Sequence, residues 1–559
     1  GRAAETANFT HFTGDPLYYS RSFEYLNQVD MKEVREFAQK YLNRDRAAAV
    51  VIEPYGEDDV VLDSSDAIYK GAVRRETTFS MIDLSEVNAE MLEGIMSPPN
   101  LTAMREFTLD NGLDVVLVPY GEAPILQAAV FFKASEWDEP KPGLDSYTHS
   151  NLDYDYYSAL PLAGTYMSGA TDSYRYQGVN GSSANYEGLV WLLRKRVETL
   201  RPYVNDRGTY LTGAKKSIRY GRTFPETWAS IVTNNALFPD HYLSEVRDEK
   251  DVDAYKDISM GDMQGWMDRI YRPENGTLYV VGRMEDPDAV EASIRTNWAG
   301  WDVKGEFVEF TDMPAAPDPK PRSITVIDKE RVTQTNVRLT CQTGPGTLEN
   351  KEAIEMFAGL MDRSAWVALR EQAGVTYGAG SYSATYNGGA AIIMFNSLVQ
   401  NDAVGLAVDV FLDMSKNAIE GDLDADRLTV NKLGAARKYV LGHQTSGQML
   451  NRIASAEITG FGWDYLNKRS QRLADVDVDA VQAMAEKCYE HEAVVITGPA
   501  AVITPQLDTI GVEYTVFDWK EEKERLYREN DPKAYKKAKK KEAREAKKKA
   551  RKEAKELAE

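Results

Sequence analysis

The sequence predicts an α+β fold of duplicated domains, each with a mainly antiparallel sheet and helices packed on one face. The first observation is a recurring unit, in which a helical pattern is followed by a short apolar strand. The unit begins at Val29, at Ile258 and again at Val476. The strand runs are AAAVVI, TLYVV and AVVIT, which are apolar on both faces, as in a buried strand. A closing helix and strand therefore occur three times.

The second observation is the spacing of equivalent positions in this unit. Two of these positions lie seven residues, or two helical turns, apart on one helix face. They are occupied by Val34, Met263 and Val481, and by Tyr41, Ile270 and Cys488. Positions 34, 263 and 481 are 229 and 218 residues apart. Solenoid units repeat every 20–50 residues, so these spacings indicate duplicated domains.

The third observation is that the opening of a domain also recurs. The segment TLDNGLDVVLVPYG from Thr108 reads as a hairpin around Asn111-Gly112, and a further strand starts at Ala129. The next domain opens with strands from Ser323 and Thr335, followed by a helix from about Glu352. Strands followed by helices, in each of two domains, favour helices segregated to one sheet face.

These patterns divide the chain into five parts. Residues 1–60 are the C-terminal remnant of a preceding domain, 61–100 a linker, 101–312 and 313–510 two full domains, and 511–559 a basic tail, helical or disordered. A Pro-rich segment from Thr311 separates the two domains. From Asp531 on, the tail is rich in Ala, Lys and Glu without large apolar residues, so this part has no face to bury. Its alternative role is a basic arm for an acidic membrane or RNA.

The N-terminal remnant is incomplete as a folding unit. One helix and one strand cannot bury their own apolar faces, so residues 1–60 need a sheet from elsewhere, most simply another polypeptide. The sequence has neither an initiator Met nor a signal peptide, so we expect that its first residue follows a cleavage, natural or experimental.

Composition limits the possible functions. The formal charge is −21, and from Pro532 on Lys and Arg outnumber Glu by 13 to 5, which leaves about −29 for the rest. An acidic body disfavours nucleic acid as the main partner. No apolar run is long enough to span a bilayer. Five His make a His-rich metal site improbable, and Cys341 and Cys488 form at most one disulfide, which leaves the redox compartment open.

Several segments resemble the pitrilysin/insulinase family of zinc peptidases, which includes mitochondrial processing peptidase and the bc1 core subunits. They are NGLDVVLVP, FFKASEWDEPKPGL, RPENGTLYVVG, TNVRLTCQTG, LREQAGVTYGAG and the closing unit from Val476. The resemblance covers roughly residues 15–510. It implies four homologous α+β domains in two halves around a chamber, with this chain supplying the end of the second domain and all of the third and fourth.

The family's zinc motif, H-x-x-E-H, places two imidazoles one helical turn apart with a Glu that activates water. After Pro142-Gly143-Leu144 this chain reads DSYTHSNLDYDYY, so Ser146, His149 and Ser150 stand where His, Glu and His are needed. Ser is no comparable zinc ligand, and no H-x-x-E-H or H-E-x-x-H occurs in the chain. We expect no metal ligands and no cofactor in this chain, and zinc in its partner.

The resemblance also implies a pair of catalytic residues in the last domain, Arg370 and Tyr377, seven residues apart in LREQAGVTYGAG. A guanidinium and a phenol aimed at a carbonyl stabilise the negative charge that grows on its oxygen when water attacks. Gly374 between them suits a helix C-cap, which lets a strand begin near Thr376. The alternative is that Arg370 is a solvated helix end and Tyr377 a half-buried strand residue.

The preferred hypothesis is the C-terminal, non-zinc part of a pitrilysin-like metallopeptidase. This chain, inactive alone, would complete the active site and peptide chamber of a partner chain or cleavage fragment that carries H-x-x-E-H. The substrate would be unfolded peptide, and the location periplasmic or secreted. The alternative is a catalytically inactive scaffold subunit of a larger complex, as in the bc1 core.

Overall fold

The computed structural model describes residues 2–47, 83–153, 164–171, 173–203, 206–347, 349–386, 390–420, 423 and 425–556. The chain divides into two compact units, Gly1–Ser65 and Asp66–Glu559. The first unit contains three helices within its described residues, α1 (Arg2–Thr13), α2 (Tyr18–Gln28) and α3 (Met31–Tyr41). Most of the predicted strand AAAVVI lies outside the described residues.

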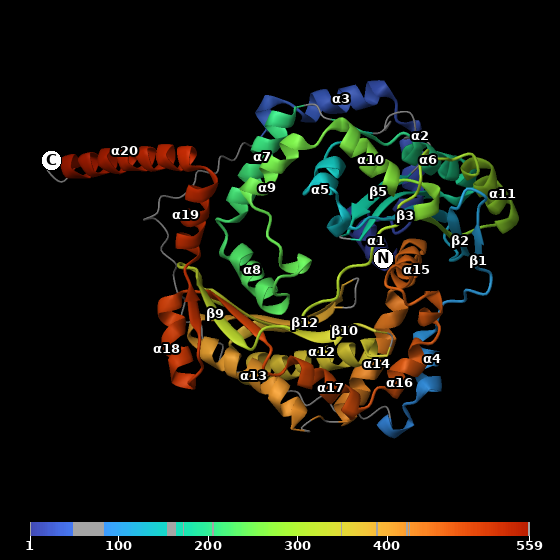
Figure 1. Cartoon of the computed structure of the whole chain (residues 1–559). Helices are drawn as coiled ribbons and strands as arrows, with labels where there is room; N and C mark the ends of the chain where they lie inside the picture. Colours follow the sequence, from blue (N-terminus) through green and yellow to red (C-terminus); the bar gives the residue numbers. More distant parts are fainter. Residues whose placement is uncertain are drawn as a thin grey trace. The chain divides into compact units, whose positions relative to one another are not determined.

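Two six-stranded sheets form the second unit (Figure 1). The first has the order β1-β2-β8-β3-β6-β5, in which only the β2–β8 pairing is parallel. Its strands are β1 (Arg105–Thr108), β2 (Asp114–Pro119), β3 (Ile125–Lys133), β5 (Thr165–Ala170), β6 (Tyr174–Ser182) and β8 (Gly276–Gly282). A small separate pair joins β4 (Leu152–Asp153) to β7 (Arg201–Pro202).

The helices of this domain pack against one face of the first sheet. They are α5 (Leu144–His149), α6 (Tyr186–Glu198), α7 (Arg207–Gly221), α9 (Glu249–Ala254), α10 (Met260–Ile270) and α11 (Pro287–Trp298). Alternate strand residues such as Leu117, Val130 and Val280 are fully buried beneath them, in one core with Met263 and Ile270. Strand side chains alternate between faces, so this set defines the helix-covered side.

The second sheet has the order β11-β12-β10-β13-β9-β14. Its strands are β9 (Ser323–Asp328), β10 (Gln334–Pro345), β11 (Thr376–Thr385), β12 (Ala390–Gln400), β13 (Ala493–Gly498) and β14 (Thr515–Phe517). The pairings of β13 and β14 with β9 are parallel, and the others are antiparallel. The predicted fold class, an α+β fold with duplicated, mainly antiparallel sheets, is confirmed.

One face of the second sheet is covered by its own helices, as the first is. They are α12 (Lys351–Ala365), α13 (Val404–Ile419), α14 (Ala425–Leu441), α16 (Arg469–Asp475), α17 (Val478–Cys488) and α18 (Ala500–Ile510). The core includes Val337, Leu339 and Phe395 from the strands and Phe357 and Phe411 from the helices. Figure 1 shows α12, α13 and α17 along this face. Helix α4 (Ala89–Met96), from the interval assigned to a linker, adds Leu92 and Met96 to this core.

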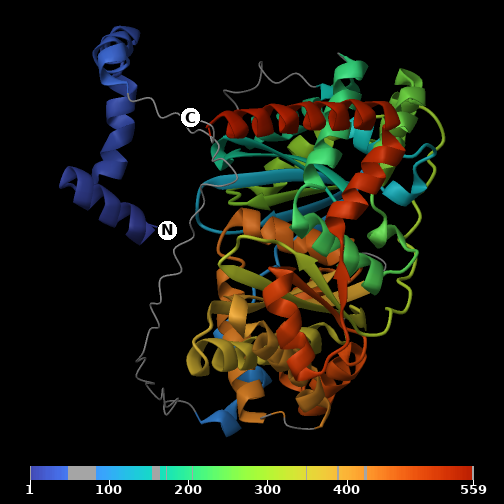
Figure 2. The same ribbon diagram turned by 90° about the vertical axis from the view of Figure 1, so that its left-hand side faces the viewer.

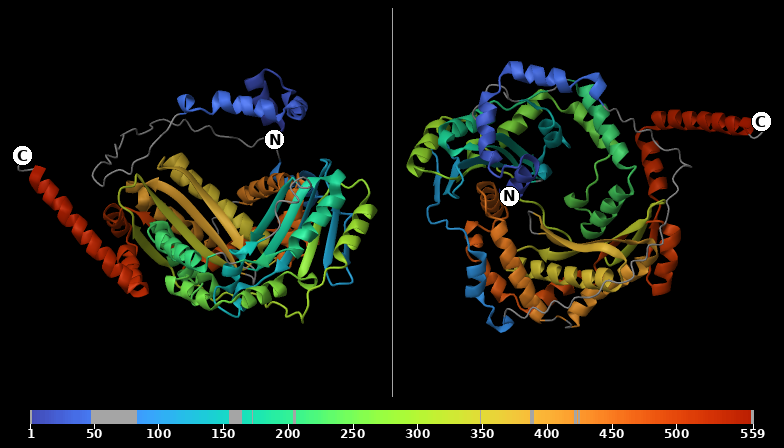
Figure 3. Two further views of the ribbon diagram at one scale, coloured as in Figure 1. Left: turned by 90° about the horizontal axis from the view of Figure 1, so that it is seen from above. Right: turned by 180° about the vertical axis from the view of Figure 1, so that it is seen from behind.

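On the opposite face of each sheet, part of the surface is covered by a helix of the other domain, and this exchange can be followed from behind in Figure 3. Helix α8 (Pro225–Leu237) follows the first sheet in sequence but packs on the second, where Trp228 contacts Ile327 and Val495. Helix α15 (Ser446–Ile458) does the reverse, burying Met449 and Ile453 against the first sheet. Each sheet is therefore completed by a helix of the other domain.

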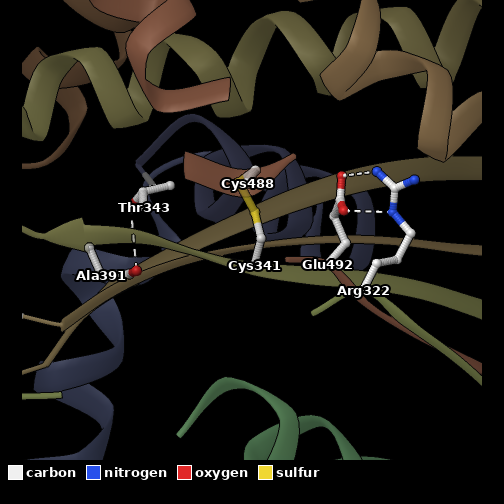
Figure 4. Close-up of a disulfide and its surroundings, with 6 residues drawn as sticks. All are labelled: Arg322, Cys341, Thr343, Ala391, Cys488 and Glu492. Atoms are coloured by element: carbon white, nitrogen blue, oxygen red, sulfur yellow. Dashed lines mark hydrogen bonds and ion pairs between the residues drawn. A yellow bond between two sulfur atoms is a disulfide. The ribbon is translucent and has the colours of Figure 1, made fainter. Parts of the chain in front are cut away.

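A disulfide joins Cys341 on β10 to Cys488 at the end of α17 (Figure 4). Both residues are fully buried. Cys488 occupies the position that Ile270 holds in α10, so the bond replaces an apolar contact between a closing helix and its sheet. Close by, Arg322 binds Glu492 through two hydrogen bonds of 2.8 and 3.2 Å and ties the starts of β9 and β13 together.

The chain after residue 510 continues as strand, helix and helix. Strand β14 extends the second sheet, and α19 (Trp519–Asn530) buries Trp519 beside Trp228. The basic helix α20 (Pro532–Glu556) follows α19, as Figure 2 shows. No helix among the described residues has the length and apolar character that crossing a membrane requires.

Candidate active-site residues

Arg370 and Tyr377 flank the turn where a helix gives way to the edge strand of the second sheet. Helix α12 continues into a π-helical segment, Trp366–Gln372, whose last turn carries Arg370. Gly374 has a φ of +69°, a left-handed conformation that suits the residue ending a helix. Strand β11 then begins at Thr376. The predicted turn thus brings the two side chains to one end of the sheet edge.

The two side chains contact each other. The Arg370 guanidinium carbon lies 5.4 Å from the centroid of the Tyr377 ring, within the range of a cation–π contact. Arg370 Nη1 also donates to the carbonyl of Thr376 at 3.0 Å. Arg370 is exposed, and Tyr377 is 82% exposed. Both polar groups thus face solvent with donors to spare.

The backbone around Tyr377 is held by the hydroxyl of Thr376. This hydroxyl donates to the carbonyl of Leu398 at 2.6 Å and accepts from the amide of Gly378 at 3.1 Å and the hydroxyl of Ser397 at 3.1 Å. The register with β12 shifts between Thr376 and Ala379, which forms a bulge containing Tyr377. Bulges commonly redirect a side chain away from the regular ladder. Sequence reasoning did not identify Thr376 or Ser397, because their role depends on strand register.

The place of the family's zinc motif is a short helix, α5, with a different set of side chains. His149 is saturated, since its Nε2 lies 2.8 Å from the hydroxyl of Tyr271 and its Nδ1 lies 3.0 Å from the carbonyl of Asp145. Ser146 and Ser150 supply no comparable donor beside it. The residues present therefore do not fit a catalytic zinc ion.

A buried ion pair occupies this region of the first domain. The Asp145 carboxylate binds the guanidinium of Arg175 and accepts a 2.8 Å hydrogen bond from Nε1 of Trp266. Burial alone would raise the pKa of Asp145. The hydrogen bond and charge of His149, with the Arg175 charge, outweigh burial and hold that pKa well below its ordinary value. These contacts make the region a structural network.

No group of three or more His, Cys, Asp or Glu residues within the described ranges is arranged to hold a metal ion. The chemistry that the described residues offer is therefore that of an exposed phenol and guanidinium, held side by side at a strand end. Both groups are hydrogen-bond donors of the kind that can stabilise negative charge on an oxygen.

Comparisons with known proteins bear on the family and the fold. Residues 257–433 match the peptidase M16 inactive domain. No curated protein matches the sequence. A protease from Helicobacter pylori is 15% identical with a TM-score of 0.61, covering 72% of this chain and 100% of its own. The resemblance to pitrilysin-like peptidases is confirmed.

Two further solved structures share the fold. The periplasmic protease PqqL from Escherichia coli is 13% identical with a TM-score of 0.57, and the match covers 84% of this chain and 51% of PqqL. A chain of complex III2 from Candida albicans is 12% identical with a TM-score of 0.54, covering 76% and 99% of the two chains. The chain thus spans about half the length of the E. coli protease.

Proposed function

Because this chain contains the M16 inactive domain and has the fold of M16-like peptidases, we propose that it is the non-zinc part of a pitrilysin-type metallopeptidase. It completes the active site and the peptide chamber of a partner chain or fragment that carries H-x-x-E-H. The substrate is a flexible peptide, and this chain alone is inactive.

The observation that carries the proposal is the exposed contact between Arg370 and Tyr377. When water attacks a peptide carbonyl, negative charge develops on the carbonyl oxygen. The phenol donates a hydrogen bond to that oxygen, and the guanidinium, a planar group of hydrogen-bond donors, orients and polarises it. A zinc ion held by the partner's H-x-x-E-H motif would supply the activated water. The residues of this chain hold the carbonyl while that attack occurs.

A second line of support comes from the unburied face of α3 in the first unit. At the three helix positions equivalent to Val34, Phe37 and Tyr41, the later domains bury Met263, Trp266 and Ile270 in α10, and Val481, Met484 and Cys488 in α17. The α3 side chains are 48%, 64% and 42% exposed. The equivalent helix face is thus buried against a sheet in α10 and α17, whereas it is exposed among the described residues of the first unit.

The three helices also begin alike. Asp30, Ser259 and Asp477 are their N-caps, and each side chain accepts a hydrogen bond from a backbone amide of the first turn. Since α3 is the counterpart of α10 and α17, we infer that its apolar face packs on a sheet of the same kind. The partner supplies that sheet, as part of the domain that precedes this chain's own.

The disulfide bears on location. Disulfides persist in oxidising compartments and are rare in the cytosol, so Cys341–Cys488 favours a periplasmic or secreted protein. The similarity to a periplasmic protease agrees with that assignment. Outside the cytosol, peptide degradation is a fitting role for this fold.

The decisive experiment uses the complex of this chain with its zinc-bearing partner, purified together, and a fluorogenic unstructured peptide. We predict that Tyr377→Phe and Arg370→Ala each lower kcat about 10²- to 10³-fold, the usual effect of removing one donor to a developing oxyanion. Both side chains are exposed, so the thermal unfolding midpoint should hardly change.

Matched controls lie on the same elements. Tyr382 is 57% exposed on β11, and Arg363 is exposed near the end of α12, so Tyr382→Phe and Arg363→Ala should keep full activity. Parallel loss of kcat and stability in the Arg370 and Tyr377 variants would remove their catalytic assignment.

The second candidate is a scaffold subunit without catalysis, which the likeness to a chain of complex III2 favours. Sequencing the chain that copurifies with this one discriminates the two. H-x-x-E-H in the partner supports the peptidase, whereas a stable partner without it supports the scaffold.

A further inference from the structure

Arg338 is a charged residue in the middle of β10, the central strand of the second sheet. Its neighbours in sequence, Val337 and Leu339, are fully buried on the helix-covered face, so alternation places Arg338 on the opposite face. In the ladder it is paired with Asn396 on β12 and with Val495 on β13. It is only partly exposed.

No acidic side chain among the described residues pairs with the guanidinium of Arg338. Its Nε is buried without a hydrogen-bond partner among the described residues. Burial lowers the pKa of Arg338, and no acidic group offsets that effect. Two other arginines, one fully and one partly buried, contrast with it. Arg175 binds Asp145 and Glu136, and Arg322 binds Glu492.

The neighbouring side chains on this face are polar and also have hydrogen-bonding capacity to spare. Asn336 donates to Asn396 at 2.7 Å, which leaves each amide with further donor groups. Thr340, two residues beyond Arg338 on the same face, buries its hydroxyl without a partner among the described residues. Two hydrogen-bond donors without a partner among the described residues, on Arg338 and Thr340, thus lie next to each other on the same face of β10.

An arginine in this position costs stability. A desolvated charge without a partner is unfavourable, and replacing it by a neutral group of similar size is often stabilising. Groups that destabilise the folded state in this way are commonly kept for binding or catalysis. The group that would offset the charge is an anion that accepts hydrogen bonds from a guanidinium, most simply a carboxylate.

We propose that Arg338, with Asn396 and Thr340 beside it, is a subsite for a carboxylate of the bound peptide. The carboxylate comes from an acidic side chain or from the C-terminus of the peptide. This inference rests on the proposed function, since it takes the ligand to be the peptide held at Arg370 and Tyr377.

The subsite lies on the same sheet as the proposed catalytic pair. On β12, Asn396 is paired with Arg338 of β10 on one side and with Gly380 of β11 on the other. Gly380 lies three residues after Tyr377 in the sequence. Strands are about 4.8 Å apart and rise about 3.3 Å per residue, so the backbone positions of Arg338 and Tyr377 are separated by roughly 12–14 Å. An extended peptide covers that span in about four residues. The carboxylate is therefore expected about four residues from the polarised carbonyl.

The test measures binding of labelled peptides to the full chain by fluorescence anisotropy. Three otherwise identical unstructured peptides are used: one with an internal Glu and an amidated C-terminus, one with Gln and an amidated C-terminus, and one with Gln and a free C-terminus. We expect at least one carboxylate peptide to bind about tenfold more tightly than the neutral peptide. The two carboxylate peptides distinguish the side chain from the C-terminus as the source.

Variants assign the preference to Arg338. Arg338→Gln should abolish the preference, Arg338→Lys should keep part of it, and Arg437→Gln, at an exposed position on α14, should leave it intact. The unfolding midpoint of Arg338→Gln should equal or exceed that of the native chain. Equal affinity for all three peptides, or no binding of any, would overturn the subsite. So would a preference that survives in Arg338→Gln, or a marked loss of stability in that variant.

This result is separable from the proposed function. Full activity in the Arg370 and Tyr377 variants would reject the catalytic assignment, and the carboxylate preference would still be measured directly as binding.

Discussion

The hydroxyl of Tyr279 donates to the carboxylate of Glu457 where α15 crosses the first sheet. Burial raises the pKa of Glu457, and the nearby charges of Glu106 and Asp114 raise it further, although the hydrogen bond from Tyr279 opposes the change. Burial also raises the pKa of Tyr279, so the phenol stays protonated. The contact between the domains thus includes a carboxyl group that favours the folded state more when it is protonated than when it is charged.

This contact predicts a pH dependence. A carboxyl group with a raised folded pKa binds more protons in the folded state, so its contribution weakens as pH rises above its unfolded value near 4.5. Glu457→Gln keeps a hydrogen-bond acceptor and removes the charge. We expect the variant to be more stable than the native chain at pH 7, with a difference that shrinks towards pH 4.5. Urea denaturation at several pH values measures it, and a difference independent of pH would contradict the explanation.

At the residue scale, sequence predicts partners that are close along the chain. Arg370 and Tyr377 were identified through the family resemblance, whereas the helix cap at Gly374 and the strand start near Thr376 were predictable from the local sequence. The isolation of Arg338 was not predictable, because it depends on which side chains neighbouring strands place beside it. The support that Thr376 receives from Ser397 and Leu398 depends in the same way on the register of β11 and β12.

Helices α8 and α15 are the elements that join the two domains. Trp228 on α8 is 2% exposed and packs between Val495 and Trp519. Ile453 on α15 is fully buried in the core formed with Val116 and Tyr279. Burying such a side chain contributes roughly 1.5–3 kcal/mol, so the exchanged helices hold the sheets together mainly by apolar contact.

Truncation of Trp228 tests this exchange. We expect Trp228→Ala to lower the free energy of unfolding by about 3–5 kcal/mol, the usual cost of removing a large aromatic from a core. Trp191 on α6 is 42% exposed, so Trp191→Ala should cost far less. Chemical denaturation measures the loss of unfolding free energy in each variant. A loss in Trp228→Ala as small as that in Trp191→Ala would show that α8 is not part of the cooperative structure.

At the element scale, the closing helix and strand were predictable, because periodicity identifies a helix with one apolar face and a short apolar run identifies a buried strand. Helices α10 and α17 and strands β8 and β13 correspond to those predictions. The exchange of α8 and α15 was not predictable, since an apolar face does not specify which sheet covers it. Strand β14 was not predicted either, because three residues are too few for a pattern.

Across the whole molecule, the disulfide closes a long covalent loop, since its two cysteines are 147 positions apart in the sequence. It links the central strand of the second sheet to the helix that ends the repeated unit. A cross-link over so long a loop restricts the unfolded chain and is expected to stabilise the folded one.

Removal of the disulfide should lower the free energy of unfolding by about 2–5 kcal/mol, which Cys341→Ala/Cys488→Ala tests by chemical denaturation. Reductant should destabilise the native chain by a similar amount and leave the double variant unchanged. A native chain that is insensitive to reductant under unfolding conditions would argue against a role for this bond in stability.

The crossing of α8 and α15 has a consequence for inheritance. A gene fragment that encoded only one of the two sheets would lack the helix that packs on that sheet. It would also encode a helix whose apolar face has no sheet to pack against. Recombination that replaced only one of the two domains would disrupt the packing of both α8 and α15. The segment from β1 to β14, which contains both sheets and both exchanged helices, is therefore expected to be inherited as one unit.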